Sequence, residues 1–297
     1  MTLGTHRHWL RPAVILVAML VFMLVFRQRT TPVQLASPQA LNSFAEALPT
    51  AAVVLPSIED APPMTAGNNA SRPTTAITAH TRIYTGAGTY TTEDVASLAE
   101  PIEAAISYVH ERTGLALSQP VNVVFDRRPG ACGLDAAAFT NVRTMFLYAC
   151  RDIPQGRAVN ILAHEVVHQL AHDRYGAAHM QADIILSEGL ATWGAGRYWL
   201  GGAPSFRDFV AENYRGNLLP LDTDSRGAST ATMNQLYYQW ASFVEWIRAT
   251  HGTAAFDNLY GGGTGRQPGT APYADVLGVS LRDAETAWQA WLDQPAP

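Results

Sequence analysis

The chain has 297 residues, of which 47% are hydrophobic and only 15% are charged, and its formal net charge at pH 7 is -5. This length and composition supply enough apolar side chains for one large folded domain or two small ones. The mild negative charge argues against nucleic acid as a partner, because nucleic-acid-binding proteins present a positively charged surface.

An uninterrupted apolar run, Ala13 to Phe26, lies close to the N-terminus. It is shorter than the ~20 residues typical of a membrane-spanning helix, so the apolar part of a signal peptide is the alternative. Arg27 and Arg29 follow directly, and the nearest Ala-x-Ala pattern, at residues 45–47, lies too far downstream for cleavage. We therefore expect residues 1–27 to be an uncleaved signal anchor that crosses the cell membrane once. The domain that follows would lie outside the cytoplasm, or be secreted if the segment is cleaved.

Residues 28–80 are rich in Pro, Ala, Thr and Ser and show no sustained hydrophobic periodicity. Such a composition is typical of a flexible linker. The sequence therefore predicts three parts, which are the anchor at 1–27, the linker at 28–80 and one folded domain at 81–297.

The folded domain begins with short strands and one long helix. Strands are expected at residues 81–84, 121–125 and 144–149, where β-branched and aromatic residues gather. Apolar residues recur at helical spacing from Thr92, the expected N-cap, to Gly114, and Pro101 is expected to kink or divide this helix. Cys132 and Cys150 are expected to form a disulfide in an oxidising compartment, the alternative being two buried thiols.

Helical patterns dominate the rest of the chain. The expected helices cover residues 158–175, about 180 to 193, 205–216, 229–252 and 280–292, with a Gly-rich loop at 261–269. Because strands come first and helices follow, the sequence predicts an α+β fold, with a small N-terminal sheet and a mainly helical C-terminal half.

The expected helix at 158–175 contains the run His164-Glu165-Val166-Val167-His168. His164 and His168 lie one turn apart on one helix face, so both imidazoles can bind one metal ion. Glu165 lies beside the first histidine, where it can reach a water molecule on that metal. This is the H-E-x-x-H pattern of zinc peptidases, which takes a third ligand from another part of the chain.

Glu188 is the candidate third ligand. It lies in an apolar helical stretch, where a buried carboxylate is unfavourable unless it is paired or bound to a metal. The separation from His168 lets the first helix end and the next return antiparallel to it, and Gly189 permits close approach of another helix. The alternative is a Glu that caps a helix or forms a salt bridge.

Three other polar side chains near these residues are not expected to be ligands. His172 is about 12 Å along the helix axis from His164, too far for these two and His168 to share one ion. We expect His179 to be a solvated polar side chain in a loop, and Asp183 to be a helix cap.

Two segments, Leu162 to His168 and Ser187 to Ala191, together resemble the gluzincins, which are thermolysin-like and aminopeptidase-N-like zinc metallopeptidases. The closest similarity is to the peptidase MA-like group, which Tyr237 to Trp246 and Leu277 to Leu281 also resemble. The resemblance covers about residues 80–295. It implies a thermolysin-like zincin domain that binds one Zn²⁺ per chain through His164, His168 and Glu188.

The resemblance also implies a mechanism. Glu165 would be the general base that takes a proton from a zinc-activated water and then passes it to the leaving amine. A tyrosine from a later helix would stabilise the oxyanion; Tyr237 is the candidate and Tyr238 the alternative by one residue, while core packing is the alternative for both. The strand at 144–149 would be the sheet edge that pairs with an extended peptide.

One position departs from the thermolysin-like pattern. Those enzymes often carry an Asp one turn after the zinc-binding Glu, where it supports a histidine ligand, and this chain has Thr192. Thr192, a backbone carbonyl or another carboxylate is expected to take that role.

The sequence therefore predicts a membrane-anchored zinc peptidase acting on peptide or protein substrates. A non-catalytic adhesion or interaction module on a peptidase-like fold is the alternative, although the intact His164, Glu165, His168 and Glu188 argue against it. A third interpretation, a chance motif in a helical domain, predicts no stoichiometric metal. Endopeptidase and exopeptidase action remain equally open.

Overall fold

The computed structural model describes residues 74–128 and 133–294. The signal anchor expected at residues 1–27, most of the expected linker and Cys132 lie outside the described residues, so the anchor and the disulfide between Cys132 and Cys150 stay predictions. Within the described part of the chain, no helix combines the length and apolarity that a membrane crossing requires.

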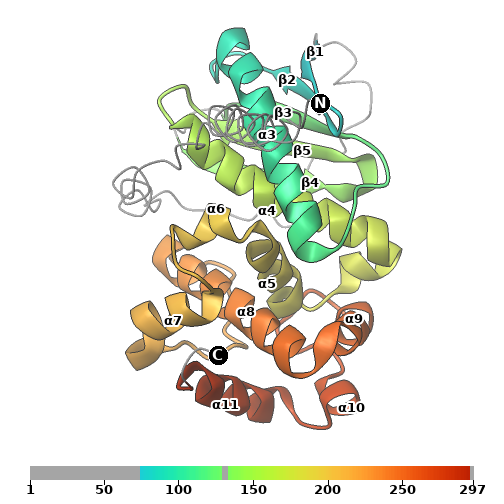
Figure 1. Cartoon of the computed structure of the whole chain (residues 1–297), viewed down its shortest axis with the longest axis vertical. Coiled ribbons are helices and arrows are strands. Elements are labelled where there is room, and N and C mark those ends of the chain that lie inside the picture. Colours follow the sequence, from blue (N-terminus) through green and yellow to red (C-terminus); the bar gives the residue numbers. More distant parts are fainter. Residues whose placement is uncertain (1–73, 129–132, 295–297) are drawn as a thin grey trace, which may run out of the picture. The chain divides into compact units, whose positions relative to one another are not determined.

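Five strands form one mixed sheet in the order β1-β2-β3-β5-β4 (Figure 1). They are β1 (Thr74–Ile77), β2 (Thr81–Thr85), β3 (Val121–Asp126), β4 (Leu134–Phe139) and β5 (Thr144–Ala149). Strands β2, β3 and β5 run parallel, and the outer strands β1 and β4 run antiparallel to their neighbours. Strand β1 lies inside the range expected to be linker, so regular structure begins before residue 81.

Strand β4 was not expected, because its sequence, Leu-Asp-Ala-Ala-Ala-Phe, has low β-propensity. It forms by pairing with β5 along its whole length, from Leu134 opposite Ala149 to Phe139 opposite Thr144. Strand β5 is therefore paired on both sides, with β3 and β4. The prediction that residues 144–149 form the free sheet edge is wrong, and β4 takes that place.

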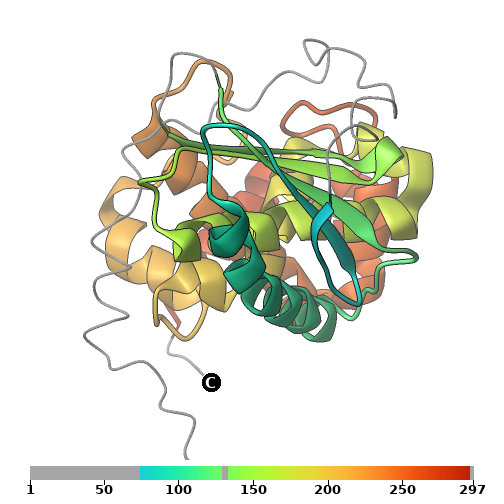
Figure 2. The same cartoon turned by 90° about the horizontal axis from the view of Figure 1, so that it is seen from above.

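Helices α3 (Thr92–Thr113) and α4 (Gln155–Tyr175) pack against each other and cover one face of the sheet (Figure 2). The N-cap of α3 is Thr91 rather than Thr92: its Oγ1 accepts a hydrogen bond of 3.1 Å from the backbone N–H of Asp94. Pro101 does not divide α3. It lies on the exposed side, where water can bond to the carbonyl that its missing N–H leaves free.

The remaining described residues are mainly helical, which confirms the predicted α+β organisation. The elements are η2 (Thr140–Val142), η3 (Gly176–Gln181), α5 (Ile184–Ala195), α6 (Arg197–Leu200), α7 (Phe206–Tyr214), η4 (Arg215–Asn217), α8 (Thr230–Thr250), α9 (Gly252–Gly261), α10 (Tyr273–Leu277) and α11 (Leu281–Leu292). Ser205, Ser229 and Ser280 are the N-caps of α7, α8 and α11. Helix α9 was not expected, because glycine is a poor helix former at its first position.

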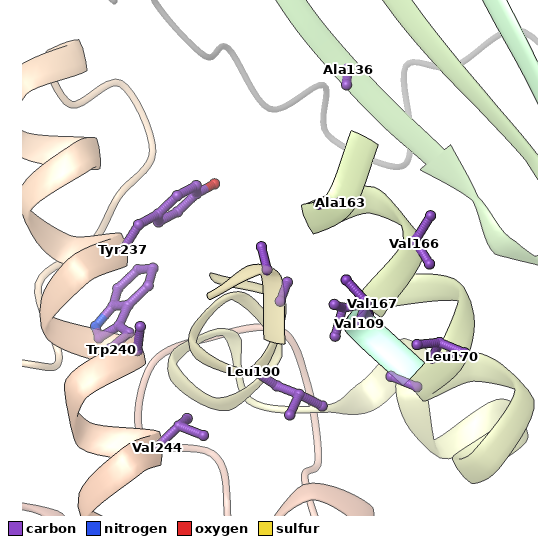
Figure 3. Close-up of a cluster of buried hydrophobic side chains, with 14 of the residues drawn as sticks. Val109, Ala136, Ala163, Val166, Val167, Leu170, Leu190, Tyr237, Trp240 and Val244 are labelled. Atoms are coloured by element: carbon purple, nitrogen blue, oxygen red, sulfur yellow. The ribbon is translucent and has the colours of Figure 1, made fainter. Parts of the chain in front are cut away.

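Helix α5 lies between α4 and α8 in the core (Figure 3). Leu190 of α5 is buried between Val167 of α4 and Trp240 of α8. The contact with α8 is close because Gly189 has no side chain: a Cβ there would lie 2.6 Å from the backbone oxygen of Trp240. The core therefore fixes α5 against one helix on each side.

Candidate metal centre

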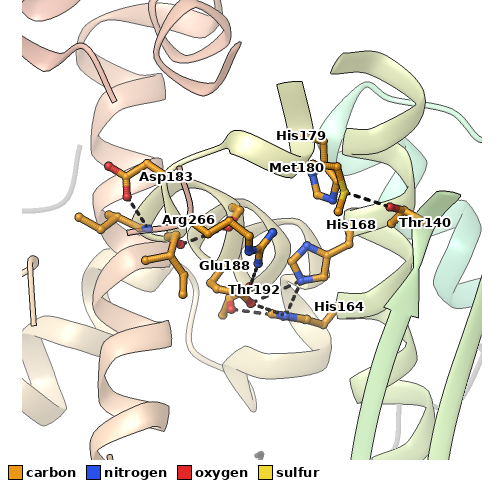
Figure 4. Close-up of polar contacts among 12 residues, drawn as sticks. Thr140, His164, His168, His179, Met180, Asp183, Glu188, Thr192 and Arg266 are labelled. Atoms are coloured by element: carbon orange, nitrogen blue, oxygen red, sulfur yellow. Dashed lines mark hydrogen bonds and ion pairs between the residues drawn. The ribbon is translucent and has the colours of Figure 1, made fainter. Parts of the chain in front are cut away.

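The three expected ligands meet where α4 packs on α5 (Figure 4). The Oε2 atom of Glu188 lies 3.2 Å from Nε2 of His164 and 3.4 Å from Nε2 of His168, and the two Nε2 atoms are 3.2 Å apart. All three side chains are buried, and Glu188 is only 1% exposed. The nearly equal distances place one atom from each residue at the corners of a small triangle.

This triangle fits a zinc ion. Ligand atoms at the usual bond lengths from a tetrahedral zinc lie about 3.3–3.5 Å from one another. The distances between the three atoms, 3.2 to 3.4 Å, agree with that spacing. Two imidazoles and one carboxylate are also the donor set of a catalytic zinc site, which leaves one position for water or substrate.

His164 is held in place by a hydroxyl group and two aromatic rings. The Oγ1 atom of Thr192 lies 3.4 Å from Nδ1 of His164, the ring nitrogen that is not part of the ligand triangle. The ring centroids of Trp199 and Tyr237 lie 5.2 and 5.7 Å from that of His164. The side chain that contacts Nδ1 of His164 therefore carries a neutral hydroxyl, whereas the thermolysin-like sequence pattern has a carboxylate at this position.

The two glutamates of the site have opposite pKa shifts. Burial, with help from the charges of Glu188 and Asp135, raises the pKa of Glu165 to about 7, although His168 and the backbone N–H of Ala138 act against it. Burial alone would also raise the pKa of Glu188, but the two imidazoles hold it well below its usual value. Glu188 is therefore ionised at neutral pH, while Glu165 can exchange a proton in that range.

Tyr237 and Tyr238 have different surroundings. The ring of Tyr237 is nearly parallel to that of His164, and its buried hydroxyl has no hydrogen-bond partner among the described residues. The hydroxyl of Tyr238 donates to the backbone carbonyl of Trp199 at 2.8 Å, and its ring stacks on Phe209 with centroids 4.1 Å apart. Tyr237 thus lies beside the candidate ligands, and Tyr238 packs against α6 and α7.

Arg266 is a site residue that sequence reasoning missed. It lies in the Gly-rich segment between α9 and α10, and its Nη2 atom is 3.2 Å from Oε1 of Glu188 (Figure 4). Nothing in the local sequence signals this contact, because the two residues are 78 positions apart. The high glycine content of the segment suggested only a loop.

His179 is buried, which corrects the expectation of a solvated side chain. Its Nδ1 atom lies 2.8 Å from the hydroxyl oxygen of Tyr260, and its ring centroid is 5.9 Å from that of His168. His179 therefore packs against His168 but is not part of the ligand triangle. His172 is likewise outside the ligand triangle, and Asp183 is the N-cap of α5, accepting from the N–H of Ile185.

No protein-family model matches the chain, and no curated protein matches it in sequence. Among solved structures, the chain is similar to a mutant of a two-domain M1 zinc metallopeptidase crystallised with L-arginine, at a TM-score of 0.39 and 18% identity. The alignment covers 73% of this chain and 49% of that one, so the chain spans about half the length of that protein. We infer the function from the site's own residues.

Proposed function

We propose that this protein is a zinc-dependent peptidase with a gluzincin-like catalytic domain. The observation that carries the proposal is the buried triangle of His164, His168 and Glu188, whose ligand atoms have the spacing of a tetrahedral zinc site. When bound, zinc would lower the pKa of a water molecule and polarise the carbonyl of the substrate.

Glu165 would move the proton in this reaction. It follows His164 directly in α4, so it lies next to the metal ligands but is not one of them. As a buried carboxylate it would accept a proton from the attacking water and later donate it to the leaving amine, acting as general base and then general acid.

Tyr237 would donate a hydrogen bond to the oxyanion. Its hydroxyl is buried, and no described residue accepts from it or donates to it. A buried hydroxyl without a partner is unfavourable in the resting protein, but it is available to a group that develops charge during the reaction.

Strand β4 would bind the substrate as an additional strand. Among the described residues it pairs with β5 on one side only, and the backbone N–H of Ala138 in β4 lowers the pKa of Glu165. This proximity to the proposed general base supports β4 as the substrate edge. An extended peptide paired with this edge would run past the metal.

The location of the enzyme is also part of the proposal. The apolar run Ala13 to Phe26 supports an N-terminal anchor. Arg7 and Arg11 before the run balance Arg27 and Arg29 after it, so only the N-terminal amine adds positive charge to the first side. This small excess supports an anchor with its N-terminus inside the cell and the catalytic domain outside the cytoplasm.

Metal analysis combined with peptide cleavage tests the proposal. We expect about one zinc per chain in the wild type and in Glu165→Gln, because Glu165 is not a ligand. We expect Glu165→Gln to lose about 10²–10⁴-fold in the hydrolysis of a mixed peptide library. His168→Ala, in contrast, should lose the metal as well as the activity.

Two results would contradict the proposal in different ways. A zinc-replete wild type that cleaves no library peptide would favour the non-catalytic interaction module. A wild type that binds no zinc would mean that the H-E-x-x-H pattern occurs here by chance.

A further inference from the structure

We propose that Arg266 is a positioning residue that holds one oxygen of Glu188 away from the metal, so that Glu188 binds through Oε2 alone. This inference rests on the proposed zinc site and adds a residue to it that lies far from the ligands in the sequence.

The two carboxylate oxygens of Glu188 have different partners. Oε2 lies 3.2 and 3.4 Å from the Nε2 atoms of the two histidines, which makes it a corner of the ligand triangle. Oε1 lies 3.2 Å from Nη2 of Arg266. A carboxylate can bind a metal through one oxygen or both, and a charge-assisted hydrogen bond to Oε1 favours binding through Oε2 alone.

The contact between Arg266 and Glu188 is shielded from water. The side chain of Glu188 is 1% exposed and that of Arg266 is 28% exposed. A hydrogen bond between charged groups is stronger in such surroundings than at an open surface, where water and salt screen it. The guanidinium group therefore restrains the carboxylate more than a surface arginine would.

The loop that carries Arg266 is fixed to the start of α5, the helix that carries Glu188. Asp183, the N-cap of α5, is fully buried. Its Oδ1 accepts a hydrogen bond of 3.0 Å from the N–H of Ile185, and its Oδ2 accepts bonds of 3.1 Å from the N–H of Ala271 and the hydroxyl of Tyr273. One carboxylate thus joins the helix to the end of the loop.

A second contact fixes the near side of the same loop. The N–H of Gly265 donates to the carbonyl of Gln181 at 3.0 Å. At Gly263 a Cβ would lie 2.6 Å from that same carbonyl oxygen, so only glycine permits the approach. Neither contact involves Arg266. We therefore expect the loop to keep its conformation when the ion pair is removed.

The test replaces Arg266 and observes the metal itself. With Co²⁺ in place of zinc, visible absorption is strong for four ligands and weaker when a fifth atom joins. In Arg266→Gln, Oε1 is released and can reach the ion, so we expect weaker absorption than in the wild type, with about one metal per chain retained. Arg266→Lys keeps a charge that can reach Oε1 and should restore part of the absorption.

Activity and stability complete the test. We expect Arg266→Gln to lower kcat about 10–100-fold, the usual cost of losing a group that orients a ligand. The melting temperature of the metal-loaded protein should change little, because the metal still balances the charge of Glu188 and the loop has its own anchors. Arg226→Gln is the matched control, since Arg226 is 70% exposed and pairs with Asp224 in a surface turn. It should leave the spectrum and kcat unchanged.

A wild-type Co²⁺ spectrum in Arg266→Gln would overturn the inference while leaving the proposed peptidase intact. Should that variant fail to fold, Arg266→Met, which has no donor for Oε1, decides the question: absorption below that of the wild type supports the inference, and an unchanged spectrum overturns it. A wild type that binds neither Zn²⁺ nor Co²⁺ would instead contradict the proposed function.

Discussion

The side chains of Tyr237 and Tyr238 are neighbours on α8, but their hydroxyl groups have different surroundings. The hydroxyl of Tyr238 has an acceptor in the carbonyl of Trp199, and that of Tyr237 has none among the described residues. Removing the hydroxyl of Tyr238 deletes a hydrogen bond from the core. Removing the hydroxyl of Tyr237 eliminates a buried polar atom that has no hydrogen-bond partner, which removes an unfavourable contribution to stability.

We expect Tyr237→Phe to lower kcat about 10²–10³-fold with little change in KM, since an oxyanion donor acts mainly in the transition state. Its free energy of unfolding should be unchanged or slightly higher. Steady-state kinetics with a cleaved library peptide and urea unfolding measure the two effects.

Tyr238→Phe is the matched comparison and should show the reverse pattern. It should lose about 1 kcal/mol of stability with its hydrogen bond and keep its kcat. Equal losses of kcat in the two variants would mean that Tyr237 acts only through packing.

The residues that the sequence could predict are those with a local pattern. His164 and His168 are four positions apart on one helix, and Glu188 is recognisable as a carboxylate in an apolar stretch. Arg266 and His179 were missed because their partners come from distant segments: Arg266 meets Glu188 and His179 meets Tyr260 only after the chain has folded. No periodicity or spacing reports such a contact.

At the level of elements, the position of Glu188 depends on how closely α5 approaches α8. At Gly189, the next residue, a Cβ would lie 2.6 Å from the backbone oxygen of Trp240 and 2.8 Å from Cγ2 of Val244. The backbone of Trp240 cannot move away by a change of rotamer, as a flexible side chain can. An added methyl group must therefore push the two helices apart.

We expect Gly189→Ala to destabilise the protein by about 1–3 kcal/mol, as overpacking of a core does. It should also weaken zinc binding, because Glu188 moves with α5 relative to the histidines of α4. Urea unfolding of the metal-free protein and competition with a zinc chelator measure these effects.

Gly261→Ala is the control for the helix propensity of alanine. Gly261 ends α9, and a Cβ there meets nothing within 4 Å. This substitution should be neutral or slightly stabilising. A Gly189→Ala variant as stable as the wild type would show that α5 and α8 have room to separate.

The elements missed by sequence reasoning are those that tertiary contacts create. Strand β4 contains three alanines and an aspartate, and its pairing with β5 makes it a strand. Helix α9 starts at Gly252, whose φ of 83° ends α8 and turns the chain into the next helix. Capped helices with regular apolar spacing, such as α8 and α11, were predicted because their signals are local.

At the scale of the whole domain, the metal site joins the sheet half to the helical half. Helix α4, which packs on the sheet, supplies the two histidines and Glu165, the proposed general base, and α5 and α8 supply Glu188 and Tyr237. The distances within the ligand triangle therefore depend on how firmly α4 is fixed to the sheet half.

Asp173, near the end of α4, makes that connection. Its carboxylate accepts hydrogen bonds from Arg143 Nη1 at 2.5 Å, from the N–H of Ser118 at 2.8 Å and from Gln169 Nε2 at 3.0 Å. Burial alone would raise the pKa of Asp173, but these bonds outweigh it and lower the pKa to about 2. The ionised carboxylate thus ties α4 to the segments that precede β3 and β5.

We expect Asp173→Asn to lower the free energy of unfolding by about 2 kcal/mol at neutral pH, from the difference between the folded and the usual pKa. Because the folded pKa is the lower one, this contribution is present above about pH 4 and is lost as pH falls towards 2. The difference between wild type and variant should therefore shrink over that range. Urea unfolding of both proteins from pH 7 to pH 3 measures it.

Asp224→Asn is the control that distinguishes a long-range ion pair from a local one. The pKa of Asp224 is also lowered to about 2, by hydrogen bonds from Arg226, but the pair is exposed and only two residues apart. Such a pair can form in the unfolded chain as well, so its loss should not change stability at any pH. A pH-independent difference for Asp173→Asn would mean that the variant disturbs packing, and that the charge of Asp173 does not hold α4 in place.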